Sequence, residues 1–160
     1  MTFEWNDYKT EDAAEIDTWL DESAMRFTGM DDGWNADVEY WKENAGDDLF
    51  RCKTISFDGV MTGAVYIIGW HEDDTEGFTI GEIILRPDAR GKGLGTAMLK
   101  DLLDRSGEII GTQLNPVDAV IFTSNTASKR MFEKAGFTVK TRDDDPTTMD
   151  ALYCRNVDQA

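Results

Sequence analysis

One stretch, residues 80–104, constrains the fold of this chain more than any other; it reads IGEIILRPDARGKGLGTAMLKDLLD. Residues 80–85 are apolar apart from one carboxylate, Glu82, as is typical of a buried strand. Pro87 has no amide hydrogen, so we expect the strand to end or bulge there. From Leu94 onward apolar residues recur at helical spacing, which predicts an amphipathic helix. The stretch therefore predicts a strand, a turn and a helix in succession.

The turn, residues 90–95, reads RGKGLG. Three glycines let a ligand approach the backbone closely, and the helix start supplies free amides, a combination that typically binds phosphate. A nucleotide P-loop is excluded because Lys92 is followed by Gly93 and not by Ser or Thr. A dinucleotide fingerprint fails because Thr96 occupies its last glycine position and no first βαβ unit surrounds it. A tight turn without any ligand remains the alternative.

The rest of the chain predicts an antiparallel meander followed by a crossover. We expect strands over residues 3–8, 49–57, 60–70, 78–85, 119–123, 137–140 and 149–156 and helices over residues 10–20 and 34–44. Asp58-Gly59 is a hairpin turn and residues 71–76 form a polar hairpin loop. The strand at 119–123 follows the crossover helix, so it should pair parallel with the strand at 80–85.

Between the first two helices lies a segment that we interpret as a connecting loop. It carries Met25, Phe27 and Met30. These side chains either belong to the core or wall a substrate pocket. The sequence leaves both interpretations open.

Charge limits the partners of the chain. It has 32 acidic and 16 basic residues among 160, a formal net charge of −16. Such a surface repels nucleic acids and anionic membranes and attracts cationic ligands. We therefore expect neither a nucleic-acid nor a membrane partner, and a cationic amine is a favoured substrate.

Length and composition predict one soluble domain over residues 1–160. No apolar run is long enough to span a membrane, and the acidic N-terminus is unlike a signal peptide. Cys52 and Cys154 lack metal-ligand spacing, and we expect both to be reduced in the cytoplasm. A disulfide between them is the less favoured alternative.

A second motif begins at Asn125, which suits a helix N-cap, and ends at Gly136-Phe137. In the turn after the central strand, Arg90, Gly93 and Gly95 have the spacing Arg-x-x-Gly-x-Gly. Together the two motifs resemble the GNAT family of N-acetyltransferases. The matching positions of the second motif are Asn125, Ser128, Phe132, Gly136 and Phe137.

The resemblance implies an α/β (α+β) fold: a mixed, mostly antiparallel twisted sheet, flanked by helices and splayed between two parallel central strands. Acetyl-CoA would lie in the gap as co-substrate, and no metal is implied. The cofactor-binding residues carried over are, for the pantetheine arm, Ile83, Ile84 and Leu85; for the pyrophosphate, Arg90, Gly91, Lys92, Gly93, Leu94, Gly95 and Thr96; and, in the second motif, Asn125, Ser128 and Phe132.

Glu82 is the favoured catalytic base. An alkylamine has a pKa of about 10.4 and must lose a proton before it attacks a thioester. A carboxylate inside an apolar strand is costly unless it is paired or functional. The alternatives are that Glu82 faces an open surface or pairs with a basic residue.

The general acid is not assigned. Family members usually carry tyrosine where this chain has Phe132, which cannot donate a proton. Tyr66, Tyr153 or Cys154 are substitutes that nothing in the sequence places near the thioester sulfur. His71 lies between charged residues in a polar loop, and we interpret it as a surface residue.

The sequence thus predicts an acetyl-CoA-dependent N-acetyltransferase that acts on a primary amine of a small cationic molecule by direct attack. The alternatives are a protein or peptide N-acetyltransferase and a catalytically weakened acyl-CoA-binding module. A homodimer is compatible with the resemblance.

Overall fold

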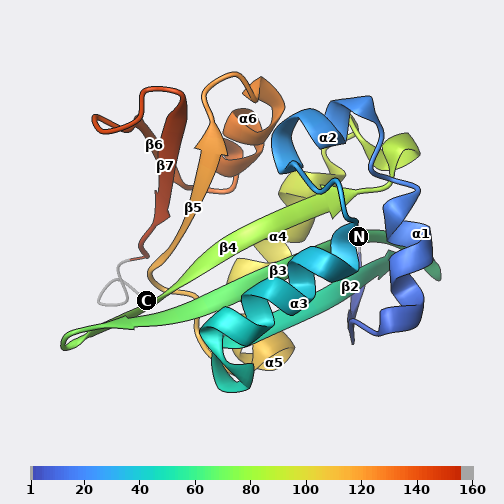
Figure 1. The fold of residues 1–160 in the computed structure, drawn as a ribbon, viewed down its shortest axis with the longest axis horizontal. Coiled ribbons are helices and arrows are strands. Elements are labelled where there is room, and N and C mark those ends of the chain that lie inside the picture. The colour runs from blue at the N-terminus through green and yellow to red at the C-terminus, as the bar shows by residue number, and fades with distance from the viewer. Residues whose placement is uncertain (1, 156–160) are drawn as a thin grey trace.

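Seven strands form one sheet in the computed structural model, which describes residues 2–155 (Figure 1). Their order across the sheet is β1-β2-β3-β4-β5-β7-β6. All neighbouring strands are antiparallel except β4 and β5, which are parallel, as predicted. The strands are β1 (Phe3–Asp7), β2 (Phe50–Phe57), β3 (Val60–Glu72), β4 (Thr75–Leu85), β5 (Val117–Phe122), β6 (Thr138–Thr141) and β7 (Thr148–Tyr153).

Helices cover both faces of the sheet. The α-helices are α1 (Ala13–Asp17), α2 (Glu22–Thr28), α3 (Trp34–Ala45), α4 (Leu94–Asp104), α5 (Ser106–Ile110) and α6 (Thr126–Lys134), and short 3-10 helices span Thr10–Asp12, Asp47–Leu49 and Pro87–Ala89. In Figure 1, α3 lies in front of the sheet and α4 behind it. None of the helices in the described part of the chain is long and apolar enough to cross a membrane.

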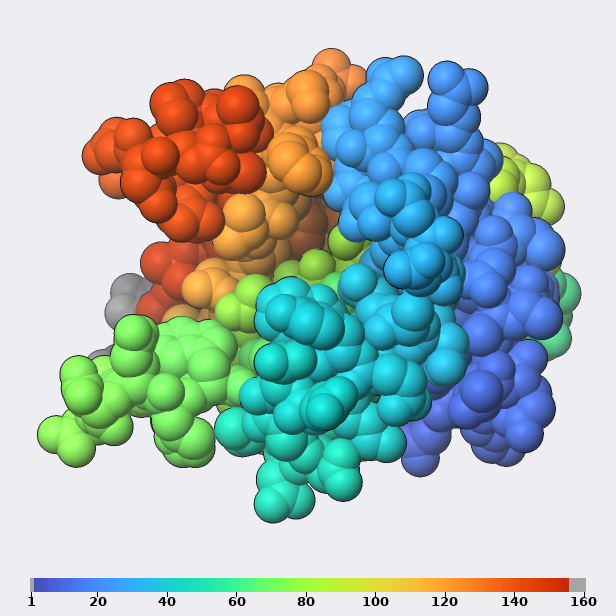
Figure 2. Space-filling view, viewed as in Figure 1, coloured from blue at the N-terminus to red at the C-terminus, as the bar shows by residue number. Residues whose placement is uncertain are grey.

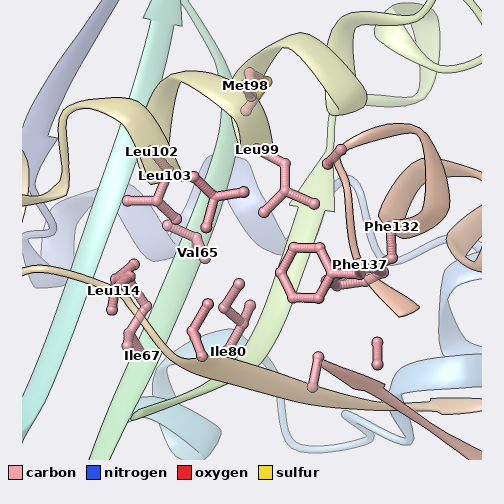
Figure 3. Packing of buried hydrophobic residues seen from close by; sticks show 14 of the residues in the cluster. Val65, Ile67, Ile80, Met98, Leu99, Leu102, Leu103, Leu114, Phe132 and Phe137 are labelled. Carbon is pink, nitrogen blue, oxygen red and sulfur yellow. The ribbon is translucent and has the colours of Figure 1, made fainter. Parts of the chain in front are cut away.

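Strand β3 divides the core into two layers because its residues alternate between the two faces of the sheet. Val65 and Ile67 lie on the face that carries α4, in a core cluster that also includes Leu102 and Leu103 of α4 and, farther along the sheet, Phe132 of α6, as Figure 3 shows. Tyr66 points to the opposite face, where it packs with Trp34 of α3. Since both faces are covered, β3 is a nearly continuous apolar strand.

The parallel pair is short, and this opens the sheet. Strands β4 and β5 are paired only at Phe78↔Val117 and Thr79↔Asp118. Immediately after these pairs β4 contains a bulge, because Tyr66 is opposite Glu82 whereas Ile67 is opposite Ile80. A bulge bends its strand, and from this point β4 runs without β5 as a ladder partner. The splayed sheet that the resemblance implied is confirmed.

Gly81 is the extra residue of the bulge. An ideal Cβ at this position would overlap the ring of Tyr66. Only glycine therefore lets the Tyr66 ring lie across the bulged backbone.

The predicted loop before α3 contains a helix, α2, and this part of the prediction was wrong. Asp21 caps α2 by accepting the Ala24 amide at 2.9 Å, and Gly29 ends the helix with a φ of 63°. The side chains of this segment differ in their surroundings: Met30 is buried in the core, Met25 is half-buried, and Phe27 lines a cavity.

Three other predicted segments also differ from the structure. The loop at 71–76 is shorter than expected, since β3 and β4 stay paired as far as Glu72↔Thr75 and only a two-residue turn remains. The first helix starts as a 3-10 turn at Thr10–Asp12 and ends at Asp17. The connection after α4 contains the one-turn helix α5.

Candidate functional site

A cavity of about 210 Å³ occupies the gap between β4 and β5. Its walls are residues 80–83 of β4, residues 119–122 of β5, Asn125, Ser128 and Phe132 at α6, Phe27 of α2, and Thr148. The rings of Phe27 and Phe122 lie 6.4 Å apart, so α2 reaches across the gap to β5. In Figure 2 the surface is hollowed between the N-terminal helices, in blue and cyan, and the C-terminal strands, in orange and red.

Glu82 is the carboxylate of this cavity. Burial and, to a smaller extent, the nearby charge of Asp37 raise the pKa of its side chain to about 8, whereas a hydrogen bond to the Ile83 backbone opposes both effects. None of the ion pairs among residues 2–155 includes Glu82. The alternative in which Glu82 is held by a basic residue thus finds no support in the described part of the chain.

Two neighbours of Glu82 have roles that the sequence did not indicate: Asp37 was not singled out, and Tyr66 was considered only as an acid. The Tyr66 hydroxyl donates a hydrogen bond of 2.6 Å to Asp37 Oδ2. Burial, followed by Asp37, raises the pKa of Tyr66 far above its usual value, so the phenol stays protonated. One sequence signal was available: Asp37 lies three residues after Trp34 and four before Trp41, on the side of α3 that faces the sheet.

Only part of the glycine-rich turn at residues 90–95 has the geometry of a ligand-binding loop. Gly91 and Gly93 have φ values of 75° and 77°, and a Cβ on either would meet open space. Gly95 serves packing instead, because its Cβ would lie 2.8 Å from Met131 Sδ of α6. The first turn of α4 closes with Ala97 N donating to Gly93 O at 3.1 Å, so the preceding helical amides have no partner within the helix.

Those free amides belong to Leu94, Gly95 and Thr96, and Lys92 beside them is exposed. Amides and a positive charge at a helix start make a suitable anion site.

Arg90 has its side chain turned away from that anion site. Its guanidinium donates to the Leu85 carbonyl at 3.1 Å, to the Trp19 carbonyl at 2.8 Å and to Asp21 Oδ2 at 2.8 Å. The side chain thereby fixes the α1–α2 connection against the end of β4. The Arg90 backbone amide is also engaged, since it donates to the Pro87 carbonyl at 3.3 Å, so the donors left for an anion come from the residues after Arg90.

The end of β4 presents an unpaired backbone edge to the gap. Ile83, Ile84 and Leu85 pair with Val65, Ala64 and Gly63 of β3 on one side. On the other side β5 has already separated. Their side chains are core: Ile84 packs beneath the N-terminal helices, and Ile83 and Leu85 pack on the α4 face.

The second motif starts α6. Asn125 Oδ1 accepts the Ser128 amide at 3.2 Å, which confirms the predicted cap and leaves the Asn125 side-chain NH₂ group as a donor at the cavity. Phe132 is 3% exposed and packs edge to face on Phe137 at 4.9 Å. Ser128 lines the cavity beside it.

No substitute for the missing tyrosine emerges at the cavity among the described residues. The Tyr66 hydroxyl already donates a hydrogen bond to Asp37, and Tyr153 packs against Phe137. Cys52 and Cys154 are both free thiols. His71 is 60% exposed beside Glu76, which confirms its interpretation as a surface residue.

Comparison with known proteins agrees with this geometry. A model described as the acetyltransferase (GNAT) family matches residues 7–137. No curated protein matches the chain. Among solved structures, the chain is similar to an acetyltransferase from Thermus thermophilus, with a TM-score of 0.71 and 20% identity over 96% of this chain and 97% of that one.

Two further solved structures share the fold. One is AAC(6')-Ib in complex with acetyl-CoA, with a TM-score of 0.68 and 20% identity over 94% of this chain and 93% of that one. The other is spermidine N-acetyltransferase from Vibrio cholerae in complex with CoA and spermine, with a TM-score of 0.67 and 15% identity over 94% and 92% of the two chains.

Proposed function

The chain belongs to the acetyltransferase (GNAT) family, and we propose that it transfers the acetyl group of acetyl-CoA to the primary amine of a small cationic molecule. One observation carries this proposal. The cavity between the separated strands β4 and β5 holds the carboxylate of Glu82, whose pKa is raised to about 8. A carboxylate of this kind is a base suited to an ammonium substrate near neutral pH.

Acetyl-CoA fits the features around the cavity. Its pyrophosphate would bind the amides of Leu94, Gly95 and Thr96, with Lys92 nearby and with Gly91 and Gly93 keeping the approach open. Its pantetheine arm would hydrogen-bond the unpaired edge of β4 at residues 83–85. The Asn125 side-chain NH₂ group, Ser128 and Phe132 would contact the arm from α6.

The reaction requires a neutral amine at the thioester. The acceptor ammonium gives a proton to the Glu82 carboxylate, directly or through a water, and the amine nitrogen then bonds to the acetyl carbonyl carbon. The carbon–sulfur bond breaks and CoA leaves as the thiolate. The second nitrogen proton ends on that thiolate, whereas the first passes from Glu82 to solvent. No covalent acyl-enzyme is formed.

The test is thiol release from acetyl-CoA over polyamines, aminoglycosides, amino acids and short peptides. Glu82→Gln should lower turnover at least 100-fold and leave the Kd of acetyl-CoA unchanged, since a positioned base contributes about 10²–10⁴. Glu76→Gln, an exposed acid of the same strand, is the matched control. Turnover of Glu82→Gln equal to that of Glu76→Gln would remove Glu82 as the base. A response to peptides alone would indicate a protein acetyltransferase.

One observation favours a second candidate, an acyl-CoA-binding module with weakened catalysis. Phe132 lies at the cavity where family members carry tyrosine. Acetyl-CoA binding without thiol release for any amine in the panel would support this candidate.

A further inference from the structure

Three oxygen-bearing side chains from three elements lie close together, and one of them, Glu82, lines the cavity. Asp37 comes from α3, Tyr66 from β3 and Glu82 from β4. Tyr66 and Glu82 are direct cross-strand partners, and Tyr66 bonds Asp37 at 2.6 Å. The Tyr66 ring is fixed in place because it lies across Gly81 and is only 3% exposed. The cluster is therefore rigid on the side of the sheet that carries α3.

The cluster is acidic and lacks a protein counter-ion. Neither Asp37 nor Glu82 takes part in any ion pair found among residues 2–155. The other titratable group near Tyr66 is Cys52 of β2, and burial raises the pKa of that thiol to about 12, so it stays neutral. When Glu82 is ionised, its carboxylate is repelled by Asp37, and a cation brought by a ligand relieves this repulsion.

The direction of the hydrogen bond between Tyr66 and Asp37 means that the cluster offers a ligand only hydrogen-bond acceptors. Tyr66 donates its only proton to Asp37, so its oxygen can only accept a further hydrogen bond. Asp37 and ionised Glu82 are also acceptors. An alkylammonium group has three N–H donors and one positive charge, and it complements three acceptors of this kind.

We propose that Asp37 is an acceptor-binding residue that, with the oxygen of Tyr66 and the carboxylate of Glu82, binds the ammonium group of the substrate amine. This inference rests on the proposed function and specifies its substrate class. Asp37 and Tyr66 hold the ammonium, and Glu82 takes its proton. An amine that carries a carboxylate on the same carbon is repelled by Asp37, so aliphatic amines are preferred over the corresponding α-amino acids.

The kinetic test uses the best amine of the panel. Asp37→Asn keeps an oxygen that can accept the Tyr66 hydroxyl, so it changes the charge and preserves the contact. The KM for the amine should rise about tenfold or more, with a smaller change in kcat and an unchanged Kd for acetyl-CoA. Glu43→Gln removes the same charge from an exposed position of α3 and should leave KM within twofold. A KM for Asp37→Asn that matches Glu43→Gln would overturn the proposal.

A second measurement does not depend on activity. The Glu82 carboxyl, assigned by its loss in Glu82→Gln, is titrated by ¹³C NMR in the wild type, Asp37→Asn and Glu43→Gln. The Glu82 pKa should fall in Asp37→Asn alone, because a negative neighbour has been removed. An unchanged pKa would show that Asp37 does not act at Glu82 and would end the proposal. If no amine is acetylated, the proposed function fails, while the titration still decides whether the acidic cluster exists.

Discussion

At the scale of single residues, the proposed site is built around one carboxylate, Glu82, placed where burial disfavours its charged form. Glu82 was recognisable from the sequence because it interrupts an otherwise apolar strand. Asp37 had only a weaker signal, its helical spacing from Trp34 and Trp41, and the fold alone brings it to Tyr66. Pairing across strands and helices decides which acids act together, and a linear pattern does not contain that information.

The raised pKa of Glu82 makes folding stability depend on pH. Between its usual pKa near 4.5 and its folded pKa of about 8, the folded chain holds a proton that the unfolded chain releases. Stability therefore falls as the pH rises through this window and levels off above it. Glu82→Gln lacks this loss, so the difference in unfolding free energy between Glu82→Gln and the wild type should shift in favour of the variant by on the order of 5 kcal/mol from pH 4 to pH 9.

Urea unfolding at pH 4, 6, 8 and 9 measures this difference. The two proteins differ only at residue 82, so the pH dependence of the difference reports the linkage of the Glu82 carboxyl to folding. Glu76→Gln should show no such trend. A constant gap between Glu82→Gln and the wild type would mean that the Glu82 carboxyl is not perturbed by burial.

Substitution of Phe132 tests how much a tyrosine hydroxyl at the cavity would increase kcat. A thiol has a pKa of about 8.5, so CoA can leave as the thiolate without a general acid. Phe132→Tyr should therefore raise kcat less than about tenfold, well below the 10²–10⁴ of a required acid. Phe137→Tyr places the same hydroxyl on the adjacent ring, which does not line the cavity, as a control. A 100-fold gain for Phe132→Tyr alone would favour the weakened module.

At the scale of elements, the strand, turn and helix of residues 80–104 were predicted well, yet the three glycines have different tasks. Gly91 and Gly93 supply positive φ, whereas Gly95 allows α4 to approach Met131 of α6. The sequence could not separate these tasks, because the second depends on a helix some thirty residues later. Helix α2 was missed for a related reason: it is short, and its cap at Asp21 is strengthened by Arg90 from a distant turn.

Gly93→Ala tests the turn as a pyrophosphate site. Gly93 and Gly111 have nearly the same backbone angles, with φ of 77° and 80° and ψ of 5° and 6°, and a Cβ on either meets open space. Alanine should cost each position about 1–2 kcal/mol of stability. Only Gly93→Ala should also raise the Kd of acetyl-CoA, by tenfold or more, in calorimetry. Equal affinities for both variants would place the pyrophosphate elsewhere.

At the scale of the whole molecule, the meander, the crossover and the parallel pair followed from hydrophobic periodicity and chain order. For the cavity, the sequence predicted the gap between β4 and β5 but not the full set of walls, because these come from α2, β4, β5 and α6 together. Periodicity reports which residues face a core. It does not report how far two strands diverge, and here a one-residue bulge at Gly81 marks where that divergence begins.

The net charge of −16 is a property of the whole surface and predicts a response to salt. Like charges repel more in the compact chain than in the unfolded one, and salt screens them over a Debye length that falls from about 30 Å at 0.01 M to about 3 Å at 1 M. The free energy of unfolding, measured in urea, should therefore rise by about 2 kcal/mol between 10 mM and 1 M KCl. The double variant Asp73→Asn, Asp74→Asn neutralises two exposed acids of the β3–β4 turn and should gain less from the same salt. Stability that is independent of salt, or an equal gain in the variant, would mean that surface repulsion does not limit this fold.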